Sequence, residues 1–294
     1  MKGFGYFIKP VRKKPLLLVI LGVITFLYCY MEYTFLMPIV FGISTLKTGN
    51  AFDSIMHLIQ LVLSYIPSIS PTVFVYLIIS VVAFSMVAGL LMSGTLNILN
   101  STLVESDKQK GTFAEGIRKH YLKISRITFL TIVYSVLFTI FIIVVSIPSI
   151  VITSASITEK PELLTVAYIL DFITVGVLFF SIMFFKIYIS FWYPAAINYN
   201  KKLFAMGKRA ADHSFWGVLF RFLGFDLLVF VFQMGLFYMN NVLTRNNSIV
   251  SEFFGVVILL IVNWIFKTII LISIISFVFS KFLAYWNRPK STAN

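Results

Sequence analysis

The chain is a succession of long apolar runs that are separated by short polar segments. Each run exceeds the roughly 20 residues that a helix needs to cross a hydrocarbon core. Because lipid offers the backbone no hydrogen-bond partners, each run is expected to be helical. The pattern predicts an all-α, polytopic membrane protein in which residues 1–294 form a single six-helix transmembrane domain. The six predicted spans are about 15–41, 72–104, 127–152, 163–193, 215–240 and 253–280.

Basic residues gather in alternate connecting segments. Of the 24 Lys and Arg residues, 19 lie before span one, between spans two and three, around the start of span five, and after span six. The opposite connections hold Lys47, Lys160 and Arg245. Since cytoplasmic loops carry an excess of Lys and Arg, this alternation predicts cytoplasmic N- and C-termini in the plasma membrane of a bacterial cell. The net charge of +13 then reflects topology, and no nucleic-acid partner is expected because no polar domain is long enough to bind one.

The basic connections have a pattern of their own. Residues 111–126 begin with Thr112 and Glu115 in the spacing of a capping box, and their apolar residues recur at helical intervals. We interpret this segment as a basic amphipathic helix on the anionic inner leaflet, and a plain cytoplasmic extension of the span is the alternative. The residues predicted to contact anionic membrane lipid are Arg118, Lys119, Lys123, Lys208 and Arg209.

A short motif occurs twice, at a separation of 91 residues. The segment Phe-Ala-x-Gly-x-Arg spans 113–118 and again 204–209. Adding 91 to 72–152, the limits of spans two and three, gives 163–243, close to the limits of spans four and five. The agreement predicts a parallel repeat of spans 2–3 and 4–5, although four matched residues alone could arise by chance.

One segment resembles a known group of proteins. Residues 193–219, YPAAINYNKKLFAMGKRAADHSFWGVL, run from a span end through a polar turn and a short helix to an aromatic return. This pattern, with 111–127 as a weaker copy, resembles a broad group of six-span bacterial and archaeal membrane proteins. The group includes the membrane domain found beside some glycerophosphodiester phosphodiesterases. The resemblance implies the six-span architecture but not that activity, because the acidic metal-binding residues of the phosphodiesterase have no counterpart here. The residues that carry it are Asn200, Ala205, Ser214, Phe215 and Trp216.

Ionisable residues inside the runs are candidate functional residues, because a charge in lipid is costly. Lys186, Asp226 and Lys267 each lie 12–14 residues from the cytoplasmic end of their run. At 1.5 Å per residue they are about 18–21 Å deep, near the middle of the membrane. Asn263 lies four residues before Lys267, and Gln233 lies seven after Asp226, so each pair shares a helix face. These five residues form the candidate intramembrane polar site.

Two interpretations of this site stay open. It is either a buried ion pair that fixes which helices are neighbours, or a substrate or proton site that lines a polar cavity. Glu32 and Asp171 lie nearer the outer side, where we expect outside water to reach them.

Catalytic and metal-binding patterns do not occur in the sequence. It contains no G-x-S-x-G, H-E-x-x-H, paired-glutamate or P-loop motif. Cys29 is the one cysteine, and His57, His120 and His213 share no helical spacing. We therefore predict no enzyme activity, no metal site and no cofactor.

The leading functional hypothesis is a non-enzymatic integral membrane protein, an accessory, scaffold or resistance-type component with a membrane-protein partner. The alternative is a transporter or permease subunit with a polar site near the membrane midplane. Ser85, Gly89, Ser93 and Asn97 recur every four residues, a pattern that favours close helix packing over ligand contact. A dry core with a satisfied ion pair would favour the scaffold, and a water-filled cavity would favour transport.

The charge distribution makes a topological prediction. A reporter fused after His120 should be active in the cytoplasm, because the basic segment around it is retained there. Paired alkaline phosphatase and fluorescent-protein fusions measure this, with a fusion after Asn246 as the control that should give the opposite result. A reporter at His120 that is active only outside the cytoplasm would contradict the predicted orientation.

Overall fold

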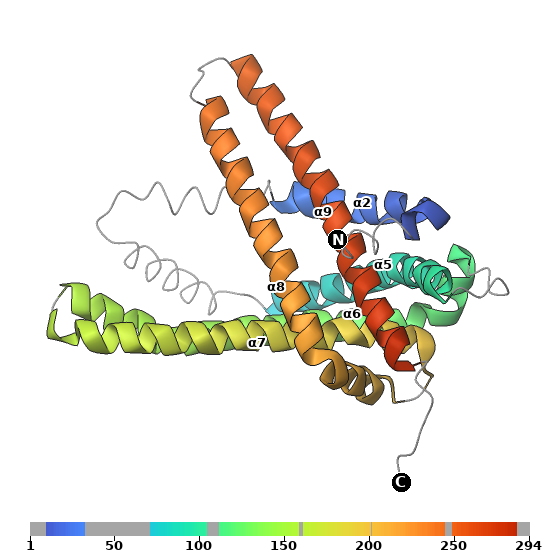
Figure 1. Cartoon of the computed structure of the whole chain (residues 1–294), viewed down its shortest axis with the longest axis horizontal. Coiled ribbons are helices and arrows are strands. Elements are labelled where there is room, and N and C mark those ends of the chain that lie inside the picture. Colours follow the sequence, from blue (N-terminus) through green and yellow to red (C-terminus); the bar gives the residue numbers. More distant parts are fainter. Residues whose placement is uncertain are drawn as a thin grey trace, which may run out of the picture. The chain divides into compact units, whose positions relative to one another are not determined.

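The computed structural model describes residues 10–32, 71–104, 112–158, 161–200, 202–244 and 249–286. Apart from a few residues that join or end helices, every residue in these ranges is helical, and no strand occurs among them. The all-α prediction is therefore confirmed for the described part of the chain. In chain order, the elements are α2 (Leu16–Met31), α5 (Pro71–Leu103), α6 (Phe113–Thr158), a 3-10 turn (Pro161–Leu163), α7 (Leu164–Asn198), α8 (Leu203–Thr244) and α9 (Ile249–Trp286) (Figure 1).

Five helices, α5 to α9, are long and apolar enough to cross a membrane within the described ranges. They fit a multi-pass integral membrane protein, as the apolar runs predict. The helix α2 covers 16 residues of the predicted first span, Leu16–Met31, and is shorter than a crossing requires. The remainder of that span, residues 33–41, lies outside the described residues, so the six-span count stays a prediction.

The long helices extend well beyond a bilayer core. At 1.5 Å per residue, the 46 residues of α6 reach about 69 Å, more than twice the roughly 30 Å of hydrocarbon. The predicted amphipathic segment 111–126 and the predicted span 127–152 thus belong to one continuous helix from Phe113 onward. The basic segment that holds the second copy of the motif, residues 204–209, likewise continues into the predicted span 215–240 within α8. This continuity agrees with a helical extension of the span, and contact with the inner leaflet stays a prediction.

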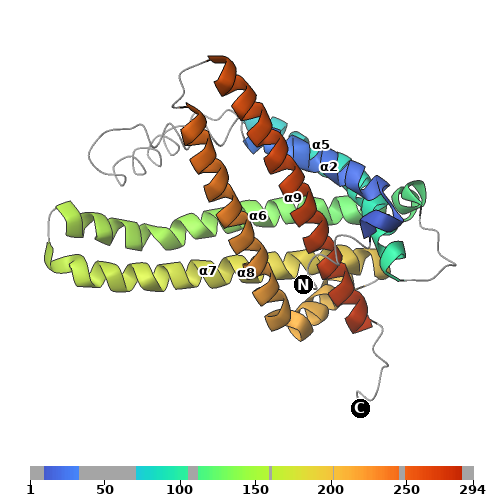
Figure 2. The same cartoon turned by 45° about the horizontal axis from the view of Figure 1, so that its top comes forward.

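The chain forms two compact units. Unit 1 comprises Met1–Leu36, Leu90–Ile124 and Ile187–Asn294, and unit 2 comprises Met37–Gly89 and Ser125–Lys186. Each of α5, α6 and α7 therefore contributes one part to each unit. Within unit 1, α8 and α9 lie side by side and α2 packs on α9, as two views of the model show (Figures 1 and 2). The core of this unit combines aliphatic side chains with fully buried rings, which are those of Phe191, Phe222, Phe277, Phe279 and Phe282.

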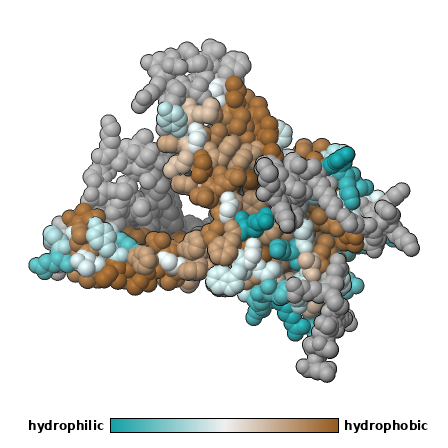
Figure 3. All heavy atoms as spheres, viewed as in Figure 1, coloured by the Kyte–Doolittle hydropathy of each residue, from teal (hydrophilic) through white to brown (hydrophobic). Residues whose placement is uncertain are grey.

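Unit 2 is built around α6 and α7, which lie side by side. The rings of Phe138 and Phe185 stack with their centroids 4.3 Å apart. Of the most apolar stretch of α6, 6% is buried inside the protein, and the share is the same for α7. Phe172 is 83% exposed, and hydrophobic atoms, brown in Figure 3, cover long stretches of the described helices. Water-soluble proteins avoid such surfaces, so this exposed area is suited to lipid.

The first copy of the repeated motif holds the start of α6 against α5. The ring of Phe113 fills the space that a side chain at Gly94 would occupy. A Cβ added to Gly116 would lie 2.6 Å from the Cβ of Asn97 and 2.7 Å from the carbonyl oxygen of Ser93. The two helices therefore approach so closely that a hydrogen atom is the only side chain that fits at Gly116.

The second copy makes the same kind of contact between α8 and α7. Phe204 packs edge-on against Trp192, with ring centroids 5.0 Å apart. A Cβ added to Gly207 would lie 3.2 Å from the carbonyl oxygen of Phe191. In both copies the phenylalanine and the glycine lie against the preceding helix, while the repeat of whole spans stays a prediction.

These contacts predict a graded response to adding one methyl group. Gly116→Ala should lower the free energy of unfolding by about 1–3 kcal/mol, because the backbone of α5 cannot yield easily. Gly207→Ala should cost less, since its nearest neighbours are farther away. Gly224→Ala is the control, because no described atom lies within 4 Å of its added Cβ; it should stabilise by up to about 1 kcal/mol through helix propensity. Thermal unfolding in detergent measures the order, and equal effects at all three positions would contradict it.

Candidate functional site

An ion pair inside unit 1 joins α2 to α9. The ammonium group of Lys267 donates a hydrogen bond to Glu32 Oε2, and the two side chains are 13% and 18% exposed. The ammonium also lies 5.0 Å from the ring centroid of Tyr28. Each charge thus neutralises the other on helices composed mostly of apolar residues, which removes most of the penalty for placing either one in lipid.

Uncharged polar groups extend this contact along the same two helices. The hydroxyl oxygens of Thr25 and Thr268 lie 2.5 Å apart. Trp264 Nε1 donates to the carbonyl oxygen of Gly22 at 2.6 Å, and its ring meets Phe26 edge-on. These residues recur every three or four positions, so they occupy one face of α2 and one face of α9.

A further polar contact joins α8 to α9. Gln233 Nε2 donates to Asn263 Oδ1 at 2.9 Å, and Asn263 is 2% exposed. The adjacent rings of Phe232 and Phe266 stack with centroids 3.7 Å apart. We call these contacts the polar seam, and its members are Gly22, Thr25, Glu32, Gln233, Asn263, Trp264, Lys267 and Thr268.

The structure brings together part of the predicted polar site. Lys267, Asn263 and Gln233 all belong to the polar seam. Asp226 lies on α8, seven residues before Gln233, and is half-buried. Lys186 belongs to unit 2, and its place in the predicted site stays a prediction. Both Asp226 and Lys186 have interaction partners.

The carboxylate that Lys267 contacts is Glu32, which the sequence analysis assigned to outside water. The depths of the two residues could have indicated this pairing. Measured from the cytoplasmic ends of their runs, Glu32 lies 17 residues after Pro15, about 25 Å along the helix, and Lys267 lies about 21 Å before Lys281. The two depths are similar. The expectation for Asp171 was also incomplete. Within unit 2 its carboxylate accepts hydrogen bonds from the hydroxyls of Ser149 and Thr153.

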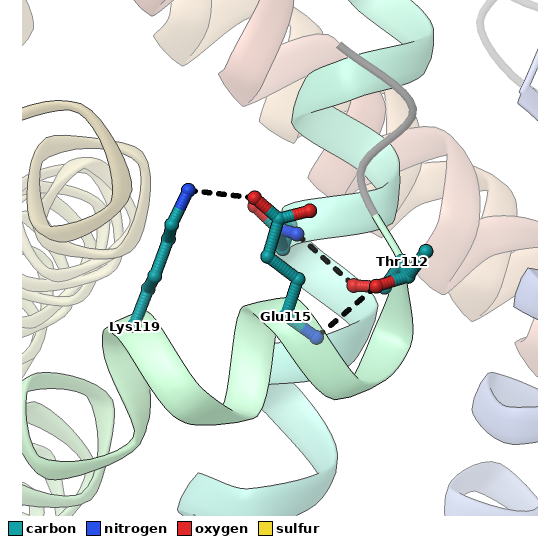
Figure 4. A network of polar contacts seen from close by, with 4 residues as sticks. Thr112, Glu115 and Lys119 are labelled. Carbon is teal, nitrogen blue, oxygen red and sulfur yellow. Dashed lines mark hydrogen bonds and ion pairs between the residues drawn. The ribbon is translucent and has the colours of Figure 1, made fainter.

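The basic segment at the start of α6 is organised by local hydrogen bonds (Figure 4). The backbone N–H of Glu115 donates to Thr112 Oγ1 at 3.2 Å, so Thr112 is the predicted N-cap. The carboxylate of Glu115 accepts from Lys119 Nζ at 2.6 Å, and this hydrogen bond and charge lower the pKa of Glu115. Asn97 of α5 donates to the carbonyl oxygen of Thr112 at 3.1 Å. The start of α6 is thereby fixed to its neighbour.

The five predicted lipid contacts fall into two groups. Lys119 pairs with Glu115, and Lys123 donates to Asn200 Oδ1 at 2.5 Å. Arg118, Lys208 and Arg209 are exposed. Lys119 is exposed as well. Four of the five side chains can therefore reach a membrane surface, and Lys119 and Lys123 also contact protein.

No protein-family model, curated protein or solved structure matches the chain. The resemblance of residues 193–219 to six-span membrane proteins therefore stays a prediction from those residues. Within the described ranges, no group of three or more His, Cys, Asp or Glu side chains could hold a metal ion.

The ion pair predicts a specific pattern of mutant stabilities. Lys267→Met should lower the free energy of unfolding by about 3 kcal/mol, because it leaves Glu32 buried without its counter-charge. Glu32→Gln should also destabilise. The double variant Glu32→Gln/Lys267→Met should be more stable than Lys267→Met alone, because neither charge is then left unpaired.

Unfolding in detergent measures this double-mutant cycle. The matched control is Lys119→Met, which removes a lysine from the exposed pair with Glu115 and should change stability by less than about 1 kcal/mol. Strictly additive effects of the two seam substitutions would show that Glu32 and Lys267 do not stabilise each other.

Proposed function

We propose that the chain is a non-enzymatic integral membrane protein that acts as an accessory or scaffold component of the plasma membrane. The observation that carries the proposal is the pairing of Lys267 with Glu32. When charged residues inside a membrane serve transport, they line a route that water or substrate can reach. Here the two charges contact each other between packed helices, which supports a role in holding α2 against α9.

The other polar groups of the seam support the same conclusion. Thr25 meets Thr268, Trp264 meets the backbone of Gly22, and Gln233 meets Asn263, each across a helix boundary. Small and hydrogen-bonding side chains at such boundaries commonly stabilise the packing of membrane helices. A scaffold needs this fixed arrangement because its function is to present a constant surface.

The apolar surface of unit 2 is the part that such a scaffold would present. Phe172, Tyr168 and Val175 on α7 are each at least 65% exposed. In a membrane this surface contacts lipid or the helices of another membrane protein, and an accessory role implies such a partner. The proposed orientation, with both termini in the cytoplasm, follows from the charge distribution.

The native Cys29 provides a test of whether the seam is dry. It is fully buried on α2, one turn before Glu32. In intact membranes, a membrane-impermeant maleimide should leave Cys29 unmodified from either side and should modify it after denaturation. The positive control is Lys202→Cys in a Cys29→Ala background, because Lys202 is exposed and should react in the folded protein.

A second probe distinguishes a dry seam from one that is merely tightly packed at Cys29. Asp226→Cys in the Cys29→Ala background places a thiol on α8 at a similar depth. Modification at either position from an aqueous side, in the folded protein, would overturn the scaffold proposal and favour a transporter.

A further inference from the structure

A half-open hollow of about 330 Å³ lies between α8 and α9 in unit 1. Residues 212–217 of α8 form one wall, and Lys281, Ala284 and Tyr285 of α9 form the other. The rings of His213 and Tyr285 lie 5.6 Å apart across the two helices. The hollow is at the end of each helix that carries the basic connections, remote in sequence from the polar seam at 263–268.

The walls of the hollow provide cationic and hydrogen-bond-donating groups. Lys281 supplies an ammonium, and His213 and Tyr285 supply ring donors. Arg221, two turns along α8 from Ser214, lies over the same Phe277 ring as Lys281, at 5.5 Å and 5.8 Å from its centroid. Two cations therefore lie within 6 Å of the centre of one buried ring, and one of them, Lys281, lines the hollow. A lysine ammonium is a common partner of phosphate groups.

One wall residue is acidic, and its carboxylate has a protein partner. Asp212 Oδ1 accepts a hydrogen bond from the phenol of Tyr188 on α7. The carboxylate is thus held by a donor from a third helix, while Lys281, His213 and Tyr285 belong to the walls themselves. The phenol satisfies one oxygen but leaves the carboxylate charged, so Lys281 and Asp212 balance each other within the walls. Arg221, beside the hollow, is a second cation, and the excess of positive charge favours an anion.

An exposed apolar face of α8 continues from the hollow. Trp216 and Phe220 are 65% and 66% exposed, and their rings lie 6.3 Å apart. Gly217 lines the hollow, and Gly224 lies two turns farther on the same face. A Cβ added at either glycine would meet no described atom within 4 Å, so the helix surface is open there. A free phosphate gains nothing from an apolar face, whereas an acyl chain can lie along it.

We propose that the hollow binds one phospholipid from the leaflet on the side of the basic connections. Its phosphate lies against Lys281 and His213, and one acyl chain runs along α8 past Gly217, Phe220 and Gly224. Trp216 lies at the level of the headgroups, where tryptophan is enriched in membrane proteins. This inference rests on the chain being an integral membrane protein and is independent of its accessory role.

The charge is tested by titrating the purified full chain in detergent with fluorescent phosphatidylglycerol. The wild type should bind one lipid saturably, and Lys281→Gln should weaken binding about tenfold, the value of one charge-assisted hydrogen bond. Lys13→Gln removes the same charge from an exposed position on the N-terminal segment and should leave affinity unchanged. Equal affinity of the Lys281→Gln and Lys13→Gln variants would overturn the proposal.

The role of the hollow's shape is tested by a substitution that fills the hollow and leaves its charge unchanged. Gly217→Leu should abolish saturable binding, and the open space at this glycine means that the fold should tolerate the larger side chain. Gly176→Leu, at an equally open glycine on α7, is the matched control and should bind as the wild type does. Unaltered binding by Gly217→Leu would exclude this hollow as the site.

A competition experiment on the wild-type chain distinguishes a phospholipid from free phosphate as the ligand. Unlabelled phosphatidylglycerol should displace the fluorescent lipid, whereas diacylglycerol, which lacks the phosphate, and inorganic phosphate, which lacks the acyl chains, should not. Displacement by diacylglycerol would show that the phosphate is not recognised. Displacement by inorganic phosphate at comparable concentration would show a soluble-anion site. Either result overturns the phospholipid proposal, and neither bears on the water-accessibility test of the seam.

Discussion

The cost of placing charge in lipid constrains the rest of this structure. A lone lysine or glutamate near the middle of a membrane costs several kcal/mol, so each needs a partner on another helix. Lys267 and Glu32 meet that need for each other, and their contact joins α2 to α9. The contacts of Trp264 with Gly22 and of Thr25 with Thr268 follow once those two faces are together.

In unit 2, too, a charged group has partners on a neighbouring helix. The hydroxyls of Ser149 and Thr153 donate hydrogen bonds to the carboxylate of Asp171. Polar groups that bond to one another between helices leave the outward surface to apolar side chains. The highly exposed Phe172 is a consequence of that division rather than a defect in packing. Water would penalise such a surface, but lipid does not, and polar contacts between helices can then provide specificity that apolar burial cannot.

What the sequence predicts well is local. Run length gives the helices, and spacing gives the N-cap at Thr112. Depth and helical face grouped Gln233 and Asn263 in one candidate site, but the contact between them across α8 and α9 was not predicted. The pairing of Glu32 with Lys267 was not predicted because it depends on which helices are neighbours, and local spacing does not encode that choice. The continuity of α6 was also underestimated, since the change from basic to apolar composition near residue 126 alters the solvent around a helix without breaking its backbone hydrogen bonds.

The placement of donors bears on where a ligand could be recognised. Inside the seam each polar group named has a partner on a neighbouring helix, so a ligand would have to displace an existing contact and leave a buried group unpaired. In the hollow a ligand displaces no protein contact of this kind. Lys281 and His213 line an open hollow where water can solvate them until a ligand binds. Recognition there requires no helix to separate. These contacts support our proposal that the protein holds a lipid at its edge and does not pass a solute through its centre.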